Sequence, residues 1–400
     1  MNKQQEPRLR FKGFAGEWKN KTLGDLGRVE MCRRIFKEQT QPSGEIPFFK
    51  IGTFGQEPDA FISSELFEEY RQKYPYPKQG DILISAAGTI GRTVEFTGEN
   101  AYFQDSNIVW LRFDESQITS TFLNITYQNI KWGLEGSTIK RLYNSDLLSA
   151  EITLPSLPEQ THLGLFFRRL DSQIAESRAV LEKSRQLKKA MLAKMFPVNG
   201  EKIPKIRFKG FDGEWESRKL GIEVEIIGGG TPDTTNSAYW NGDIDWYSPT
   251  ESGEAAYANG SVKKITLLGL QKSSAQILPA NRTVLFTSRA SIGDMAILTR
   301  DGATNQGFQS FVVGERLDVY FLYTMGFKIK DYALKNASGS TFLEISKNTL
   351  SQMEFFAPSL KEQTAIGNFF RQLDETIALQ TAEVEKLNQL KKGLLAAMLV

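Results

Sequence analysis

Residues 7–18 of the chain read PRLRFKGFAGEW, and residues 204–215 read PKIRFKGFDGEW. A second pair of matching stretches follows, because the tripeptides EQT and FFR and the dipeptide LD within residues 159–171 return in the same order within residues 362–374. A repeat that fills the chain in this way indicates two copies of one structural unit. We therefore expect two similar but unequal halves that engage two similar but unequal ligands.

The composition is that of an ordinary globular protein whose charge is nearly balanced. At 400 residues the chain exceeds what one hydrophobic core usually serves, in agreement with two halves of roughly 200 residues. The net charge of +2 implies that any basic surface for nucleic acid must be local. The single cysteine, Cys32, excludes an internal disulfide and is typical of a reducing cytoplasm. No apolar run reaches the roughly 20 residues of a membrane span, so we expect a cytoplasmic protein without a membrane partner.

Each half begins with a mixed domain in which helical and strand-like segments alternate. Apolar, β-branched runs predict strands, and apolar residues at helical spacing predict helices between them. The predicted strands are residues 81–85, 107–113, 282–287 and 309–313, and the predicted helices are residues 122–131 and 320–334. The expected fold class is α+β, with two pseudo-symmetric domains.

Each half closes with a segment that is typical of a long helix. Apolar residues recur at steps of three and four through residues 157–196 and 360–400, in a heptad pattern interrupted by polar positions. The first helix would span roughly 55 Å at about 1.5 Å per residue. Two such helices in one pseudo-symmetric chain are expected to pack antiparallel as a coiled coil, with one domain at each end. The alternative is that each helix packs against its own domain.

The sequence carries no recognisable catalytic signature. It contains no G-x-x-x-x-G-K-[ST] loop, no G-x-S-x-G elbow and no H-E-x-x-H or C-x-x-C pair. The only histidine, His162, stands where the second half has Ala365, which argues against a catalytic role. One histidine and one cysteine leave no ligand set for zinc, so we expect no metal site. We therefore expect that the chain is not an enzyme by itself.

Two hydroxyl-rich turns are the strongest candidates for ligand contacts. Residues 85–92 read SAAGTIGR and residues 287–293 read TSRASIG, each directly after a predicted strand. Small residues let the backbone approach a ligand closely, while hydroxyl and arginine side chains suit phosphates or base edges. The alternative is that both segments are ordinary exits from a strand.

Basic and amide side chains elsewhere extend these two candidate sites. Arginine and lysine neutralise phosphates, whereas asparagine and glutamine read base edges; an isolated lysine is more often simply solvated. The predicted DNA-binding residues are Arg33, Arg34, Lys37, Lys50, Ser85, Thr89, Arg92, Gln104, Asn107, Lys140 and Arg141 in the first half, and Thr231, Tyr247, Lys272, Thr287, Ser288, Arg289, Ser291, Asn305, Gln306 and Gln309 in the second.

The chain resembles the specificity subunit of type I restriction-modification systems over essentially its full length. The resemblance lies in four features: the paired FKGFxGEW motifs, residues 229–246 with GGTP and YWNGDI, the turn at residues 287–293, and the paired PSLPEQ and PSLKEQ motifs at residues 155–160 and 358–363. One departure is that Ala87 occupies the place of Arg289, which moves our prediction for the first domain to Arg92.

The resemblance implies a division of labour along the chain. Residues 1–156 and 218–357 would be target-recognition domains, each reading one half of a bipartite DNA site, with residues 198–217 as a linker. The helices at residues 157–197 and 358–400 would set the spacer and dock two methyltransferase subunits. Two restriction subunits would complete the complex, and the partner subunits would bind S-adenosylmethionine, ATP and Mg²⁺, so that this chain needs no cofactor.

Two other classes of function remain open from the residues alone. One is a tandem scaffold that binds protein or carbohydrate and does not bind DNA in a salt-dependent way. The other is a nuclease with scattered carboxylates, which would cleave DNA in the presence of metal without any partner.

Overall fold

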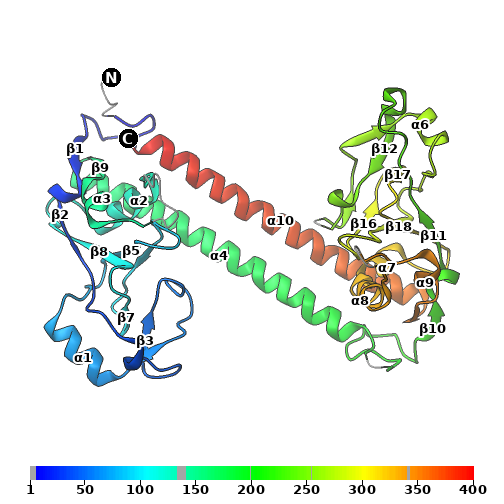
Figure 1. The fold of residues 1–400 in the computed structure, drawn as a ribbon, viewed down its shortest axis with the longest axis horizontal. Coiled ribbons are helices and arrows are strands. Elements are labelled where there is room, and N and C mark those ends of the chain that lie inside the picture. Colours follow the sequence, from blue (N-terminus) through cyan, green and yellow to red (C-terminus); the bar gives the residue numbers. More distant parts are fainter. Residues whose placement is uncertain (1–5, 133–140, 199, 254, 340–342) are drawn as a thin grey trace. The chain divides into compact units, whose positions relative to one another are not determined.

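The computed structural model describes residues 6–132, 141–198, 200–253, 255–339 and 343–400. The chain divides into two compact units, of which unit 1 comprises Met1–Ser177 with Val384–Val400 and unit 2 comprises Arg178–Glu383. Each unit therefore holds one globular part of the chain and a segment of both long helices (Figure 1).

Unit 1 contains three small sheets among its described residues. A four-stranded antiparallel sheet has the order β2-β8-β5-β6, a three-stranded sheet has the order β4-β3-β7, and β1 pairs with β9. The strands are β1 (Lys19–Thr22), β2 (Gly27–Glu30), β3 (Ile46–Phe49), β4 (Phe61–Ile62), β5 (Ile82–Ser85), β6 (Thr93–Glu95), β7 (Tyr102–Phe103), β8 (Ile108–Phe113) and β9 (Glu151–Leu154).

Helices cover these sheets and lead into the first long helix. Leu123 of α2 lies in the same buried cluster as Ile84 of β5 and Trp18, so this helix closes the core of the four-stranded sheet. The helices of this half are η1 (Leu23–Asp25), η2 (Lys37–Gln39), α1 (Ser64–Lys73), α2 (Ser120–Asn129), α3 (Asn144–Ser149) and α4 (Leu157–Met195).

Unit 2 repeats the same sheets with one added strand. Its sheets have the orders β11-β18-β15-β16-β13, β14-β12-β17 and β10-β19. Apart from β13, each pairing has an equivalent of the same direction in unit 1. The strands are β10 (Glu216–Lys219), β11 (Val224–Gly228), β12 (Trp240–Tyr247), β13 (Tyr257–Ala258), β14 (Lys263–Ile265), β15 (Thr283–Phe286), β16 (Met295–Leu298), β17 (Gly302–Thr304), β18 (Gln309–Val313) and β19 (Glu354–Ala357).

The helices of unit 2 follow the order of those in unit 1 with small insertions. They are α5 (Leu220–Glu223), η3 (Ser237–Tyr239), η4 (Pro249–Glu251), α6 (Leu267–Gln271), α7 (Val319–Thr324), α8 (Gly326–Asn336), α9 (Lys347–Ser351) and α10 (Leu360–Met398). The α+β fold and the duplicated domain are thus confirmed. The single helix predicted over residues 320–334 is instead two helices that meet at Met325.

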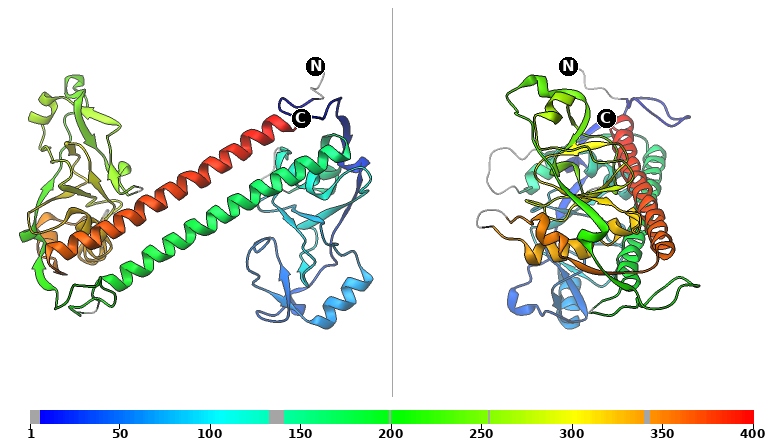
Figure 2. Two further views of the ribbon diagram at one scale, coloured as in Figure 1. Left: turned by 180° about the vertical axis from the view of Figure 1, so that it is seen from behind. Right: turned by 90° about the vertical axis from the view of Figure 1, so that its right-hand side faces the viewer.

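The two long helices contact each other in an antiparallel sense within unit 1. Asp171 of α4 forms an ion pair of 2.5 Å with Lys391 of α10, while Leu163, nearer the start of α4, shares a buried cluster with Met398, nearer the end of α10. Figures 1 and 2 show these two segments running alongside each other. The expected antiparallel pairing is therefore present in this unit.

Unit 2 contains the equivalent contact with the roles of the helices exchanged. Asp374 of α10 forms an ion pair of 2.5 Å with Lys188 of α4, and Tyr320 of α7 donates a hydrogen bond to the same carboxylate at 2.9 Å. Met195, at the end of α4, lies in one buried cluster with Phe370 of α10. The same acid–lysine pair therefore joins the two helices in both units.

The repeated FKGF and EQ motifs join each domain to its long helix. In unit 1, Arg10 donates two hydrogen bonds to the carboxylate of Glu159, at 2.7 and 2.8 Å, and a third to the carbonyl of Gly16. Glu159 lies in the first turn of α4 and is almost fully buried. A buried carboxylate needs such a partner, and the positive end of the helix dipole stabilises it further.

The glutamine that follows connects the same helix to the loop between β8 and α2. Gln160 accepts a hydrogen bond from Thr119 N at 2.9 Å and donates to the carbonyl of Gln117 at 2.9 Å. In unit 2, Arg207 binds Glu362 and Gln363 accepts from Asp318 N in the same arrangement. The motifs that first reveal the repeat are thus structural joints.

Candidate functional site

The turn after β5 is built around an inward-pointing hydroxyl. Ser85 is buried, and its hydroxyl accepts a hydrogen bond from Arg92 N at 2.9 Å and donates to the carbonyl of Thr89. The amide of Gly91 donates to the carbonyl of Ser85 at 3.0 Å. Gly88 has φ of +61°, a value that glycine adopts at no steric cost. Gly88 and Thr89 are exposed and form the tip of this turn.

The turn after β15 has the same construction from different residues. Thr287 is buried, and its hydroxyl accepts from Asp294 N at 2.9 Å and donates to the carbonyl of Ser291. Ala290 has φ of +61° where unit 1 has Gly88. A residue with a Cβ atom pays roughly 1–2 kcal/mol for this conformation, so the surrounding turn holds the backbone in place.

These contacts change the assignment of three predicted residues. Ser85, Thr287 and Ser288 are buried, with at most 1% of each residue exposed. The first two hydroxyls are used within their own turns. We therefore assign all three to the frame of the turn and retain Thr89 and Ser291, which are exposed, as candidate contacts.

An arginine stands beside the turn in both units, but on opposite sides of an isolated β-bridge. Ala87 forms an isolated antiparallel bridge with Arg141, whereas in unit 2 the corresponding bridge joins Arg289 and Glu344. Arg141 donates to the carbonyl of Ser106 at 3.0 Å. Arg289 lies along the equivalent loop, because a Cβ atom at Gly307 would be 3.6 Å from its Nε. Both arginine side chains thus lie against the loop that precedes β8 or β18. In unit 1 the arginine faces the turn across the bridge, whereas in unit 2 it belongs to the turn.

Six of the predicted residues of unit 1 meet around one cavity of about 680 Å³. Its charged lining consists of four basic side chains and two carboxylates, so the local balance is positive. The predicted residues that line it are Arg34, Lys37, Lys50, Gln104, Asn107 and Arg141. Such a polar, positively charged hollow beside the tips of strands suits an anionic ligand.

The carboxylates of this cavity hold two of its cations in place. Asp105 accepts from Arg34 at 2.9 Å, and Asp59 lies 2.8 Å from Lys50 Nζ. The side chain of Gln104 accepts from Ile51 N at 2.9 Å, so its amide group is oriented by the backbone. Sequence reasoning missed both carboxylates, although acidic partners are the usual means of fixing long basic side chains.

Two predicted arginines of unit 1, Arg33 and Arg92, have surroundings outside the lining of this cavity. Arg33 is exposed and lies 5.3 Å from the centre of the Tyr74 ring, in a cation–π contact. Arg92 donates to the carbonyl of Gly55 at 3.1 Å. It is therefore Arg141, not Arg92, that stands opposite Ala87. Lys140 lies outside the described residues.

In unit 2 the predicted amides Asn305 and Gln306 lie on the loop before β18, and Gln309 is the first residue of that strand. Asn305 accepts a hydrogen bond from Gly307 N at 2.8 Å, and the exposed Gln306 accepts one from the hydroxyl of Thr231. The side-chain oxygen of Gln309 is buried and has no hydrogen-bond partner among the described residues. These residues belong to the segment of unit 2 that is equivalent to the segment with Gln104 and Asn107 in unit 1.

Two predicted residues of unit 2 have other surroundings. Tyr247 is buried beside Leu285 and Phe308, and burial raises the pKa of its phenol to about 12, so we assign it to the core. Lys272 is exposed and lies directly after α6, where its amide caps the end of that helix.

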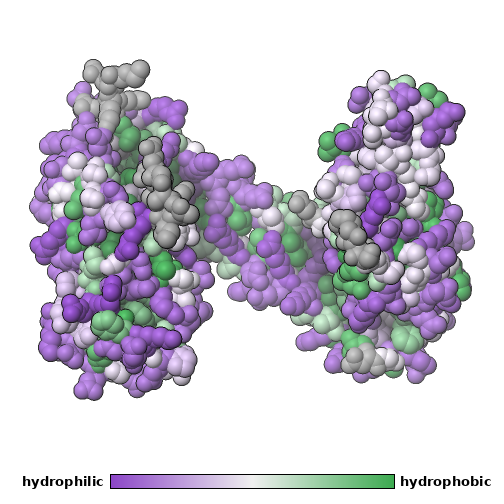
Figure 3. All heavy atoms as spheres, viewed as in Figure 1, coloured by the Kyte–Doolittle hydropathy of each residue, from purple (hydrophilic) through white to green (hydrophobic). Residues whose placement is uncertain are grey.

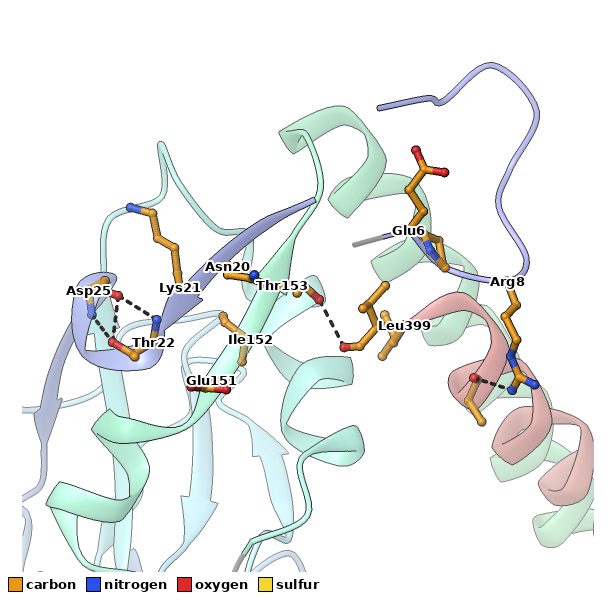
Figure 4. A pocket seen from close by; sticks show the side chains of 13 residues that line it. Glu6, Arg8, Asn20, Lys21, Thr22, Asp25, Glu151, Ile152, Thr153 and Leu399 are labelled. Atoms are coloured by element: carbon orange, nitrogen blue, oxygen red, sulfur yellow. Dashed lines mark hydrogen bonds between the residues drawn. The ribbon is translucent and has the colours of Figure 1, made fainter. Parts of the chain in front are cut away.

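A separate cavity of about 640 Å³ lies in unit 1 beside β1 and β9 (Figure 4). The figure shows the hydrogen bonds between Thr22 and Asp25. The hydroxyl of Thr153 donates a hydrogen bond to Val400 O at 3.2 Å. The hydrogen bonds from Thr22 lower the pKa of Asp25. None of the predicted DNA-binding residues lines this cavity, so it is distinct from the candidate site.

The described residues offer neither a metal centre nor a membrane span. They contain no cluster of three or more histidine, cysteine, aspartate or glutamate side chains that could hold a metal ion. Cys32 is buried, which raises the pKa of its thiol to about 12. None of the described helices combines the length and the hydropathy that crossing a bilayer requires. On the face shown in Figure 3, hydrophilic residues predominate and hydrophobic ones are scattered.

A family model described as "Type I restriction modification DNA specificity domain" matches residues 15–183 and 212–389. S.HindORF215P of Haemophilus influenzae, whose name places it among type I restriction enzyme specificity subunits, is 63% identical over 139 residues, which are 34% of this chain and 36% of that relative. The type I restriction enzyme MjaIX specificity subunit of Methanocaldococcus jannaschii is 33% identical over 194 residues, which are 47% and 43% of the two chains. The chain thus spans less than half the length of each of these two relatives.

Solved structures show the same fold over nearly the full length. The S subunit of a type I restriction-modification system from M. genitalium matches with a TM-score of 0.66 at 16% identity, covering 99% of both chains. A chain from a structure concerned with assembly and conformational transition of the type I R-M system matches with a TM-score of 0.52 at 17% identity, covering 96% of this chain and 98% of that one. Because the family model matches far more than half of the residues, this chain belongs to the type I restriction modification DNA specificity domain family.

Proposed function

We propose that this chain is the DNA sequence-recognition subunit of a type I restriction-modification complex, in which each unit reads one half of a bipartite, asymmetric site. The observation that carries the proposal is the repeated frame with unlike side chains. The same strand order and the same hydroxyl-centred turn present Ala87 and Arg141 in unit 1 but Arg289 and Glu344 in unit 2. Half-sites share the geometry of the duplex and differ in the edges of their bases, so this pattern suits them.

The proposed interface comprises the exposed or half-buried members of the predicted set. Basic residues would neutralise phosphates, and the amides and hydroxyls would contact base edges or sugars. In unit 1 these are Arg33, Arg34, Lys37, Lys50, Thr89, Arg92, Gln104, Asn107 and Arg141, with Lys140 proposed from the sequence alone. In unit 2 they are Thr231, Lys272, Arg289, Ser291, Asn305, Gln306 and Gln309.

The division of labour follows the elements. Residues 1–156 and 218–357 would form the two target-recognition domains, and residues 198–217 the linker. The helices at residues 157–197 and 358–400 would set the spacer and dock two methyltransferase subunits, which two restriction subunits would join. S-adenosylmethionine, ATP and Mg²⁺ would bind to those partners, and this chain would contribute no catalytic group.

Mapping methylated adenines throughout the genome tests the proposal. Cells with the intact gene are expected to show a two-part methylated motif that disappears when this gene alone is deleted, because the methyltransferase then has no sequence reader. The complex reconstituted with its methyltransferase should bind a duplex carrying the motif with an affinity that falls as salt rises. A genome without a motif that depends on this gene would overturn the proposal.

The purified chain separates the remaining classes of function. Binding that does not depend on DNA or on salt would favour a protein- or carbohydrate-binding scaffold. Metal-dependent cleavage of DNA by the chain without partners would favour a nuclease.

A further inference from the structure

Glu344, which sequence reasoning did not select, stands in a fixed position beside the unit 2 turn. Its amide donates to the carbonyl of Ser338, and its carbonyl accepts from the amide of Ser338, both at 3.0 Å. The next residue, Ile345, is buried and donates to the carbonyl of Ser288 at 2.9 Å. The backbone of Glu344 is therefore held from both sides, although the residue is exposed.

The bridge partner of Glu344 is the arginine of the turn. Residues directly opposite each other in an antiparallel bridge project their side chains to the same face. Glu344 and Arg289 are such partners, yet no ion pair between them is present among the described residues. The pair thus presents one acceptor group and one donor group side by side on the face of the turn.

Unit 1 provides the contrasting case within the same chain. At the matching bridge it has Ala87 and Arg141, so this position carries a guanidinium and no carboxylate. Every phosphate of the duplex repels a carboxylate, and a glutamate at this place is unfavourable unless it meets a hydrogen-bond donor. In the major groove such donors are the amino groups of cytosine N4 and adenine N6.

We propose that Glu344 is a specificity-determining residue of unit 2 and accepts a hydrogen bond from the N4 amino group of a cytosine in the major groove. Arg289 beside it contacts O6 and N7 of a neighbouring guanine. Glutamate and aspartate are suited to cytosine N4, as arginine is to guanine. The inference rests on the proposed function and deepens it, because it names a base that unit 2 reads.

The test compares methylomes of cells that carry the complete system with the wild-type gene or with Glu344→Gln. The wild-type motif is expected to contain a cytosine in the half-site that unit 2 reads, which is identified by replacing residues 218–357 with the equivalent domain of another specificity subunit. In the variant, discrimination at that one position should fall by roughly tenfold or more, because an amide no longer offers only acceptors. The matched control is Glu315→Gln, an exposed glutamate on the loop after β18, which should leave the motif unchanged.

The outcomes separate this inference from the function on which it rests. If the wild type shows no motif that depends on the gene, the proposed function itself fails. If the wild-type motif exists but its unit 2 half-site lacks cytosine, or Glu344→Gln leaves the cytosine position intact, only the role of Glu344 is overturned. A change that appears at an adenine position instead also overturns it. Equal melting temperatures of the two proteins verify that the substitution leaves folding unaffected.

Discussion

At the scale of single residues, the two units place a guanidinium against the same loop from different positions in the sequence. Arg141 lies next to the carbonyl of Ser106, and Arg289 lies along Gly307. A Cβ atom at position 307 would lie 2.7 Å from Pro249 Cγ, so glycine lets this loop pack tightly beside Arg289. Exchange of the arginine between the two bridge positions therefore alters the side chains that face a ligand without altering the backbone.

Replacement of Arg289 by alanine is expected to relax recognition in one half-site only. The loss of a bidentate arginine–guanine contact costs roughly 1–3 kcal/mol, about five- to more than a hundredfold in affinity. Methylome sequencing should show a relaxed base in the half-site of unit 2 and an unchanged half-site of unit 1. Arg300→Ala, at an exposed arginine after β16, is the control. Protection of all sites at wild-type level in a plasmid assay would contradict the role of Arg289.

The sequence indicated two turns as candidate sites but did not indicate which of their side chains point outward. From the sequence, the hydroxyls of Ser85 and Thr287 are plausible contacts to a ligand. In the structure, each accepts a hydrogen bond from the backbone amide seven residues later. The sequence did not indicate that Arg141 stands across the bridge from Ala87, because this bridge joins residues that are far apart in sequence. Register across such a bridge depends on tertiary packing and leaves no local signal.

At the scale of elements, the long helices were the most predictable part of the fold. A heptad pattern over about ten turns outweighs local irregularities, and α4 and α10 end within two residues of the expected bounds. The helix expected over residues 320–334 was less predictable. Its apolar pattern continues through Met325, where the backbone nevertheless ends α7 and starts α8. Of these two helices, α7 packs against β15 and β16, a tertiary contact that the periodicity of the sequence does not indicate.

One glycine in each helix permits close contact with its domain. A Cβ atom at Gly164 would lie 2.2 Å from Thr121 Oγ1, and one at Gly367 would lie 2.7 Å from Asp318 Oδ1. A Cβ atom at Gly393 of α10 would have no neighbouring atom within 4 Å. The three glycines thus have similar helical surroundings and differ in what faces them.

Substitution of these glycines by alanine should therefore have opposite effects on stability. Gly393→Ala is expected to stabilise the protein by up to about 1 kcal/mol, because alanine is the better helix former. Gly164→Ala should be destabilising by about 1–3 kcal/mol, since the overpacking at Thr121 exceeds that gain. Thermal unfolding of both variants measures the difference. A Gly164→Ala protein as stable as Gly393→Ala would show that the helix–domain contact is looser than described.

At the scale of the whole chain, the two halves share the contacts that hold the helices to the domains, and they differ in exposed side chains. The Arg–Glu clamp, the glutamine tie and the Asp–Lys pair between the helices occur in both units with nearly the same distances. The side chains around the turns differ at almost every exposed position. This distribution explains why the frame could be predicted from the repeated motifs, whereas the base preference of each unit could not.

The two Asp–Lys pairs make the number of residues between them a testable quantity. In α4, residues 171 and 188 take part in the two pairs, and in α10 residues 391 and 374 do so. Deletion of residues 178–184 together with residues 381–387 removes one heptad from each helix and leaves every pairing residue in place. Each helix becomes about 10 Å shorter, a length equal to roughly three base pairs at 3.4 Å per step.

The double deletion is therefore expected to shorten the unspecified spacer of the methylated motif by about three base pairs while both half-sites keep their sequences. Either deletion alone prevents the two Asp–Lys pairs from forming together and should abolish methylation of any two-part motif. Methylome sequencing of the three strains distinguishes these outcomes. A spacer that keeps its wild-type length in the double deletion would show that something other than the helices sets the distance between the half-sites.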